Sequence, residues 1–134
     1  MSMLVPKNIF ENHSILIPVG NDRWTTGPAS DKDEGFVLEV LQQAVGGFIE
    51  LVRLSDVGRA VMAESLEATC KKHDSKSSLT AEDKECIKDI CKNLMMVVNE
   101  EGLLMSLADN PEASILSGQR IVGPAVMIDQ RRLK

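Results

Sequence analysis

The sequence predicts a small α+β domain with a mostly antiparallel sheet, a packed amphipathic helix and an inserted αα-hairpin. Three observations predict this class. The chain has 134 residues, which is the size of one domain. Short apolar runs of strand character alternate with segments in which apolar residues recur at helical spacing. Two of the helical segments follow each other, separated only by the polar run 73–78, as in an αα-hairpin.

The first third of the chain predicts an arm, a strand, a loop and a helix. Residues 1–13 have weak periodicity, and Ser14–Pro18 is a short apolar strand. The segment 19–30 is rich in Gly, Pro and Thr, which is typical of a loop. Asp31 or Asp33 can cap the helix that follows. The apolar residues expected on one face of this helix are Val37, Leu38, Val40, Leu41, Ala44 and Val45.

The next predicted strand is apolar on both faces. Gly46-Gly47 ends the helix, and Phe48–Leu54 contains only Glu50 and Arg53 as charged residues. A strand that is apolar on both faces is usually buried inside its sheet. We therefore expect this strand to be central and Glu50 to be half-buried with a partner, for which Arg120 is a candidate.

Residues 56–93 predict the inserted hairpin. Ser55 or Asp56 caps a helix that runs to about Lys72, and Thr80 caps a second helix. The residues expected to face the core are Met62, Leu66 and Cys70 on the first helix, and Ile87, Ile90, Cys91 and Leu94 on the second. We expect the hairpin to be an addition to a core that folds without it.

The last third predicts a hairpin of strands, a short helix and a final strand. Leu94–Val98 and Leu103–Leu107 are the two strands, joined by a type I turn at Asn99–Gly102. Asn110 and Pro111 then begin a helix that Gly118 ends. The final elements are the strand Arg120–Ile128, with a bulge or sheet edge at Gly123-Pro124, and the basic tail 129–134.

Several of these runs resemble a small domain found mostly in phages and other mobile elements, a family of unknown function. The resemblance lies in the run Leu38–Val52, in Val97–Leu103, in Asn110-Pro111 and in Val122-Gly123. The hairpin 56–93 is an insertion relative to the shorter members. The resemblance implies a phage or mobile-element context and supplies no catalytic residue.

Composition excludes several function classes. The net charge is -5 and only 3% of residues are aromatic, which argues against a nucleic-acid-binding surface. No run approaches the length of a membrane span, and no signal-peptide pattern is present, so we expect a cytoplasmic protein, in the host cell if phage-encoded. The odd number of cysteines, three, argues against structural disulfides.

The strongest candidate for a metal site is the set Cys70, His73, Cys86 and Cys91. Four soft ligands suit structural zinc. However, Cys86 and Cys91 are separated by about 140° around a helix, so they diverge from one ion. We expect no metal, and we expect the cysteines to pack as small apolar residues.

No catalytic set is recognisable in the sequence. A thiol nucleophile needs a histidine partner, and the two histidines, His13 and His73, lie in the arm and in a polar loop. There is no nucleophile elbow and no glycine-rich phosphate loop. We therefore expect a protein without cofactor that is not an enzyme, although an unmarked carboxylate or metal site remains an alternative.

The hypothesis that remains is stoichiometric binding of a host protein or a small, nucleotide-like anion, plausibly in counter-defence. The candidate anchors are Arg53, Arg120 and the helix start at Asn110, with Arg120 the first choice. Glu50 is either a salt-bridge partner or a ligand contact. Trp24, alone in a polar loop, either covers the edge of the core or contacts a ligand. A homo-oligomeric interaction protein is the alternative function.

Overall fold

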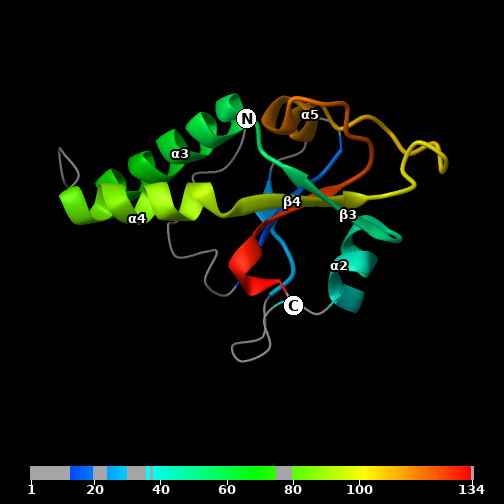
Figure 1. Cartoon of the computed structure of the whole chain (residues 1–134), viewed down its shortest axis with the longest axis horizontal. Helices are drawn as coiled ribbons and strands as arrows, with labels where there is room; N and C mark the ends of the chain where they lie inside the picture. The colour runs from blue at the N-terminus through cyan, green and yellow to red at the C-terminus, as the bar shows by residue number, and fades with distance from the viewer. Residues whose placement is uncertain (1–12, 20–23, 30–35, 37, 75–79, 134) are drawn as a thin grey trace.

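The computed structural model describes residues 13–19, 24–29, 36, 38–74 and 80–133, without the side chains of 69–74. Within these residues a five-stranded antiparallel sheet is combined with helices, so the predicted α+β class is confirmed (Figure 1). The strands are β1 (Ile15–Ile17), β2 (Thr25–Thr26), β3 (Ile49–Arg53), β4 (Leu94–Asn99) and β5 (Ala125–Asp129). The helices are α2 (Leu38–Val45), α3 (Asp56–Asp74), α4 (Ala81–Lys92) and α5 (Pro111–Ser117), followed by the 3-10 turn η1 (Gln130–Arg132).

The strand order is β2-β1-β5-β4-β3. All five residues of β5 are buried, as are all but Met95 in β4, because these two strands have neighbours on both sides and cover on both faces. In the register between β3 and β4, Leu51 lies opposite Val97. The helices provide the cover on the two faces of these strands.

Alternate residues of the strands belong to two separate cores. One core lies between the sheet and the helices α3, α4 and α5, and the other lies between the opposite face and α2. The first contains Ile15, Ile17, Val52, Leu54, Met62, Leu66, Ile87, Ile90, Cys91, Leu94, Met96, Val98, Ala113, Leu116, Ala125 and Met127. The second contains Phe36, Leu41, Val45, Val97, Val126 and Ile128. The period-two alternation of each strand produces this division.

The predicted ends of α3, α4 and α5 agree with the structure where it describes them. The first helix begins later than predicted, because Phe36 forms an isolated bridge with Leu133 and α2 starts at Leu38. Thr80 and Asp83 form a reciprocal capping box at the start of α4. The Ser55 hydroxyl accepts from the amide of Gly58 and so caps α3. At the other ends, Gly46 follows α2 and Gly118 follows α5 with φ of 83° and 75°, a left-handed conformation that glycine adopts without strain. Asp31, Asp33 and Val37, expected at the start of the first helix, lie outside the described residues.

The face of α2 is narrower than predicted. Leu41 and Val45 are fully buried, and Ala44 packs against them. Leu38 and Val40, which the pattern placed on the same face, are exposed. With only eight residues, α2 buries little more than one turn's stripe against the sheet.

β3 is the terminal strand of the sheet, so the prediction that it is central was wrong. It pairs with β4 alone, and among its five residues only Val52 is buried. Glu50 is exposed, not half-buried as expected. The strand is apolar on both faces although one edge is open, and Leu51 remains 41% exposed. Apolar composition alone therefore misplaced this strand.

The segment 103–107 does not form the predicted strand. After β4 the chain makes the expected turn, in which the amide of Gly102 donates to the carbonyl of Asn99. It then continues in turns, with Ser106 at a φ of 56°. The final strand also begins later than predicted, at Ala125, because Gly123 has a φ of 79° and Pro124 lacks an N–H for the ladder.

The helices α3 and α4 lie side by side and extend from one end of the sheet, as Figure 1 shows. Their apolar residues Met62, Leu66 and Ile87 belong to the same core as Leu94 and Met96 in the sheet. Gly58 in α3 also lies directly against α5. The helical pair thus contributes to the central packing, and its independence from the rest of the domain stays a prediction. None of the helices in the described part has the length and apolar character that crossing a membrane requires.

Candidate functional site

A groove lies between α3 and α4, where the helical pair meets the sheet. It has a volume of about 660 Å³, a size that suits a small-molecule ligand. Its lining includes five cations and one carboxylate. The lining residues are Arg53, Arg59, Ala60, Ala63, Glu67, Lys84, Ile87, Lys88, Cys91, Lys92, Asn93, Met95 and Gln130.

Four-residue spacing brings these side chains together. Arg59, Ala63 and Glu67 follow one another at four-residue steps along α3 and so share one face. On α4 the lysines at positions 84, 88 and 92 form a second row with the same spacing. Between the two rows, Ile87 and Cys91 are buried. The groove therefore has an apolar floor and predominantly cationic walls.

Arg59 is the cation of the groove that has a buried donor without an acceptor in the described part of the chain. Its Nε is buried and has no hydrogen-bond acceptor within the described residues. Its nearest carboxylate is that of the exposed Asp56, at 3.9 Å from Nη1. Leaving a buried donor unpaired costs about 1–3 kcal/mol, and more for a charged group. A rotation that turns the guanidinium towards an anion in the groove would satisfy both Nε and an Nη group in a bidentate contact.

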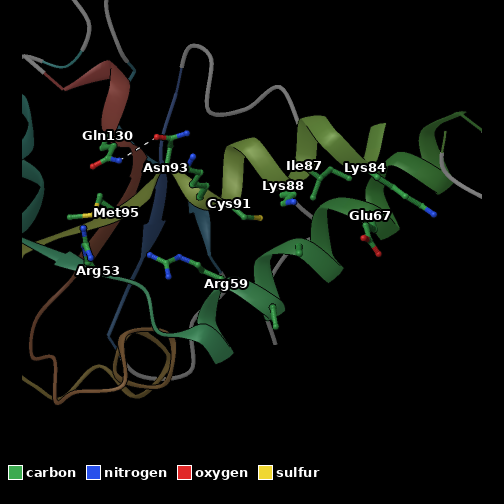
Figure 2. Close-up of a pocket in the computed structure, with 13 residues that line it drawn as sticks. Arg53, Arg59, Glu67, Lys84, Ile87, Lys88, Cys91, Asn93, Met95 and Gln130 are labelled. Atoms are coloured by element: carbon green, nitrogen blue, oxygen red, sulfur yellow. Dashed lines mark hydrogen bonds between the residues drawn. The ribbon is translucent and has the colours of Figure 1, made fainter. Parts of the chain in front are cut away.

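The other cations of the groove are also available. Within the described part of the chain, no ion pair involves Arg53, Lys84, Lys88 or Lys92. Figure 2 shows Arg53 and Arg59 at the end of the groove near the sheet, and Glu67 with Lys84 towards the far end. The two arginines thus lie at the end of the groove away from Glu67, the one carboxylate of the lining.

The buried thiol of Cys91 reports on this environment. Burial, and to a smaller extent the Glu67 carboxylate, raise its pKa from 9.0 to about 11, while the Arg59 guanidinium acts in the opposite direction. The thiol is therefore protonated at neutral pH, which makes it a poor nucleophile. It also lies close enough to Arg59 for the charge of that side chain to act on it.

Of the residues predicted as ligand anchors, only Arg53 lines this groove. Arg120 and Glu50 both line a smaller depression elsewhere in the fold, but the expected ion pair between them is not formed in the structure. The Arg120 guanidinium instead donates to the carboxylate of Asp109 at 2.9 Å, and both side chains are exposed. This exposed pair is a weak interaction that a stronger partner could replace.

Asn110, predicted as a ligand anchor, is instead buried and hydrogen-bonded within the fold. The Asn110 side chain is fully buried; its Nδ2 donates to the carbonyls of Ile17 and Gly123, at 2.9 and 3.0 Å, and its Oδ1 accepts from the amide of Ala113. These bonds leave no group of the amide directed at a ligand.

Trp24 is 4% exposed, packs in the first core and donates its indole N–H to Glu112. It covers the core, which was one of its two predicted roles.

The structure gives no support to a zinc site at Cys86 and Cys91. In the residues described, no group of three His, Cys, Asp or Glu side chains is placed to hold a metal. The side chains of Cys70 and His73 lie outside that part, so the expectation that the chain binds no zinc stays a prediction.

Sequence reasoning missed most of the groove. Arg59 and the α4 lysines come from helices that the sequence predicts, but the sequence analysis assigned these charges no role. The four-residue spacing of Lys84, Lys88 and Lys92 was the available signal. Which helix would face that row could not be derived without the packing of α3 on α4.

Comparison with protein-family models, with curated proteins and with solved structures finds no match to this chain.

Proposed function

We propose that the protein is a non-enzymatic binding module that holds a small organic anion in the α3–α4 groove, one ligand for each chain. The observation that carries this proposal is the buried, unpartnered Nε of Arg59 beside Arg53, in a groove whose walls are otherwise lined by lysines. An anion placed there neutralises repelling cations and supplies the acceptor that Arg59 lacks.

The apolar floor narrows the ligand class. Ile87 and the side-chain carbons of Ala60 and Ala63 suit a flat or apolar group next to the anionic one. A nucleoside phosphate has both parts, and the groove is large enough for one. If the chain belongs in the phage context that its sequence resemblance implies, the use of such binding is to sequester a nucleotide-like signal of the host.

Binding is favoured over turnover by the chemistry next to the Arg53–Arg59 end. The thiol that lines the groove, that of Cys91, has a pKa of about 11 and is therefore protonated at neutral pH. Glu67 is the only carboxylate in the lining and lies towards the opposite end. A positioned acid–base pair is therefore missing from the described lining, whereas a binder needs only shape and charge.

The test is calorimetric titration with inorganic phosphate, AMP and ADP, using adenosine as the uncharged control. We expect the phosphates to bind at one site per chain, more weakly as salt is raised, and adenosine to bind poorly. Arg59→Gln should weaken nucleotide binding by about 10–100-fold, the range for loss of a charge-assisted hydrogen bond. The matched control is Arg120→Gln, which removes the same charge outside the groove and should change affinity by less than about twofold.

Two results would contradict the proposal. One is equal binding by wild type and Arg59→Gln, which would place the anion elsewhere. The other is recovery of a chemically altered nucleotide from the complex, since a binding module releases its ligand intact. The mass of the ligand released by heat distinguishes intact from altered ligand directly.

A further inference from the structure

The outer edge of β3 carries backbone groups that are unpaired within the part of the chain that the structure describes. In an antiparallel ladder, successive residues alternate between hydrogen bonding to the neighbouring strand and pointing away from it. The amide of Glu100 donates to the carbonyl of Phe48, and Phe48 lies opposite Glu100 in the register. The residues that bond to β4 are therefore Phe48, Glu50 and Val52. The N–H and C=O groups of Ile49, Leu51 and Arg53 point outwards, because no described strand lies beyond β3.

This edge has only some of the features by which proteins protect exposed strands. Edge strands are usually short, carry charged side chains, especially lysine, contain proline or a bulge, or are covered by a loop. β3 is short and carries the exposed charges of Glu50 and Arg53. The strand Ile49–Arg53 has no proline, lysine or bulge, and it pairs regularly with β4 over its whole length. Leu51 in its middle is 41% exposed and Phe48 just before it is 63% exposed.

We propose that a second copy of this chain pairs with β3 antiparallel, centred on Leu51, to form one sheet across both copies. A two-fold axis perpendicular to the sheet places Leu51 opposite the partner's Leu51 and Ile49 opposite the partner's Arg53. In this register every outward N–H and C=O of the three residues faces a complementary group on the other copy. The edge is thus its own complement.

This register also brings exposed apolar side chains together, first on the face of β3 that bears α2. The two Leu51 side chains meet at the axis and bury surface that is exposed in one copy. On the opposite face, the partner's Phe48 comes to lie beside Leu54, three residues before the exposed Val57. Two apolar residues that a monomer leaves in water, Phe48 and Leu51, are therefore both at the contact.

Glu50 is the charged residue that this register has to accommodate. The register puts the partner's Glu50 opposite Val52, so the two Glu50 carboxylates lie diagonally across the axis and repel. Arg120 lines the same depression as Glu50 and Val52 in its own copy, where it is paired with the exposed Asp109, and its charge offsets part of this repulsion. A register centred on Glu50 is worse, because it puts Glu50 directly opposite the partner's Glu50. A register centred on Val52 no longer places Leu51 opposite the partner's Leu51.

The test combines solution mass with a cross-link. Light scattering on a sizing column should give twice the mass of one chain for wild type and the mass of one chain for Leu51→Pro. Proline removes an N–H that points away from β4, so the fold of each copy should persist, as circular dichroism would show. The matched control is Leu104→Lys, which changes an 85% exposed leucine outside the edge and should stay dimeric.

Leu51→Cys gives a second test, which does not require the pairing between the two copies to be disrupted. Residues directly opposite in a hydrogen-bonded antiparallel pair have Cα atoms about 5.5 Å apart, within the range of a disulfide. Oxidation should link position 51 to position 51 of the second copy, as peptide mapping would show, at least about tenfold faster than it links Leu104→Cys. A monomeric wild type, a dimer that Leu51→Pro leaves intact, or no preferential link at position 51 would each overturn the proposal. A monomer whose β3 edge instead captures an extended peptide would also overturn it.

Discussion

The backbone carbonyl of Leu116 in α5 occupies the space that a side chain on Gly58 in α3 would need. The same carbonyl accepts hydrogen bonds from the amide of Ser55, at 2.9 Å, and from its hydroxyl, at 3.1 Å. The start of α3 is therefore held on the last turn of α5 by a direct backbone contact. This contact sets where α3 leaves the sheet, and with it the position of Arg59 in the groove.

Gly58→Ala should destabilise the protein although alanine is the better helix former. Alanine gains about 1 kcal/mol in helix propensity over glycine. The added Cβ would overlap a backbone atom, which cannot move aside as a side chain can. We expect a net loss of about 1–3 kcal/mol in the free energy of unfolding, measured by urea titration with the fluorescence of Trp24.

Gly47→Ala is the control for that measurement. A Cβ there would meet only the side-chain amide of Asn99, so the loss should be smaller. If Gly58→Ala were as stable as wild type, α3 would have to sit further from α5 than the structure places it.

The comparison between sequence and structure shows which features local patterns can carry. The ends of α4 and α5 were predictable because each depends on residues within one helical turn, such as Thr80 with Asp83 and Asn110 with Pro111. β4 was predictable because its first five residues, Leu94 to Val98, are all apolar. Such features need no knowledge of the rest of the fold.

The position of β3 and the segment 103–107 were not predictable in this way. Apolar residues at Phe48 and Leu51 indicate burial, but they do not say whether the cover comes from this chain or from a second copy. The leucines at 103 and 104 suggested a strand, yet they are exposed in a run of turns. The groove could not be predicted for a related reason. Arg53, Arg59 and Lys88 come from three elements, and the packing of these elements depends on contacts between residues far apart in sequence.

Asn110→Asp should be strongly destabilising at neutral pH. The substitution preserves shape, but it replaces the Nδ2 donor by an oxygen that faces the carbonyls of Ile17 and Gly123. A buried carboxylate beside two carbonyl oxygens is disfavoured in its charged form, so its pKa would be raised in the folded state. The loss should therefore be about 2–4 kcal/mol near pH 7 and smaller near pH 4, where the carboxyl is protonated.

The control for this variant is Asn93→Asp, the same change at a half-buried amide whose Nδ2 donates to the carbonyl of Asp89 in an exposed bond. It should cost less than about 1 kcal/mol. Chemical unfolding at the two pH values measures both. Equal losses in the free energy of unfolding for the two variants would show that the buried hydrogen bonds of Asn110 do not contribute more to stability than the exposed bond of Asn93. The predicted role of Asn110 as a ligand anchor would then have to be considered again.

The stability of the wild-type protein should fall in alkaline solution through Cys91. In the unfolded chain this thiol ionises near its ordinary pKa of 9.0, whereas burial, reinforced by the Glu67 carboxylate, raises the folded-state pKa to about 11. Between these values the unfolded state has lost a proton that the folded state retains. Unfolding then releases a proton, so the free energy of unfolding decreases as the pH rises through this interval and levels off above it.

Urea unfolding at about pH 8 and about pH 10 measures this decrease, and Cys91→Ala isolates it. Lysines also titrate in this interval, but their contribution is common to wild type and variant, so the difference between the two slopes belongs to Cys91. The alanine variant should be less stable at pH 8, because it loses buried contacts, and should have the shallower decline. Cys86→Ala, in which Cys91 is retained, should keep the wild-type slope. Identical slopes for wild type and Cys91→Ala would mean that the thiol ionises as readily in the folded protein as in the unfolded chain, and that the floor of the groove is open to water.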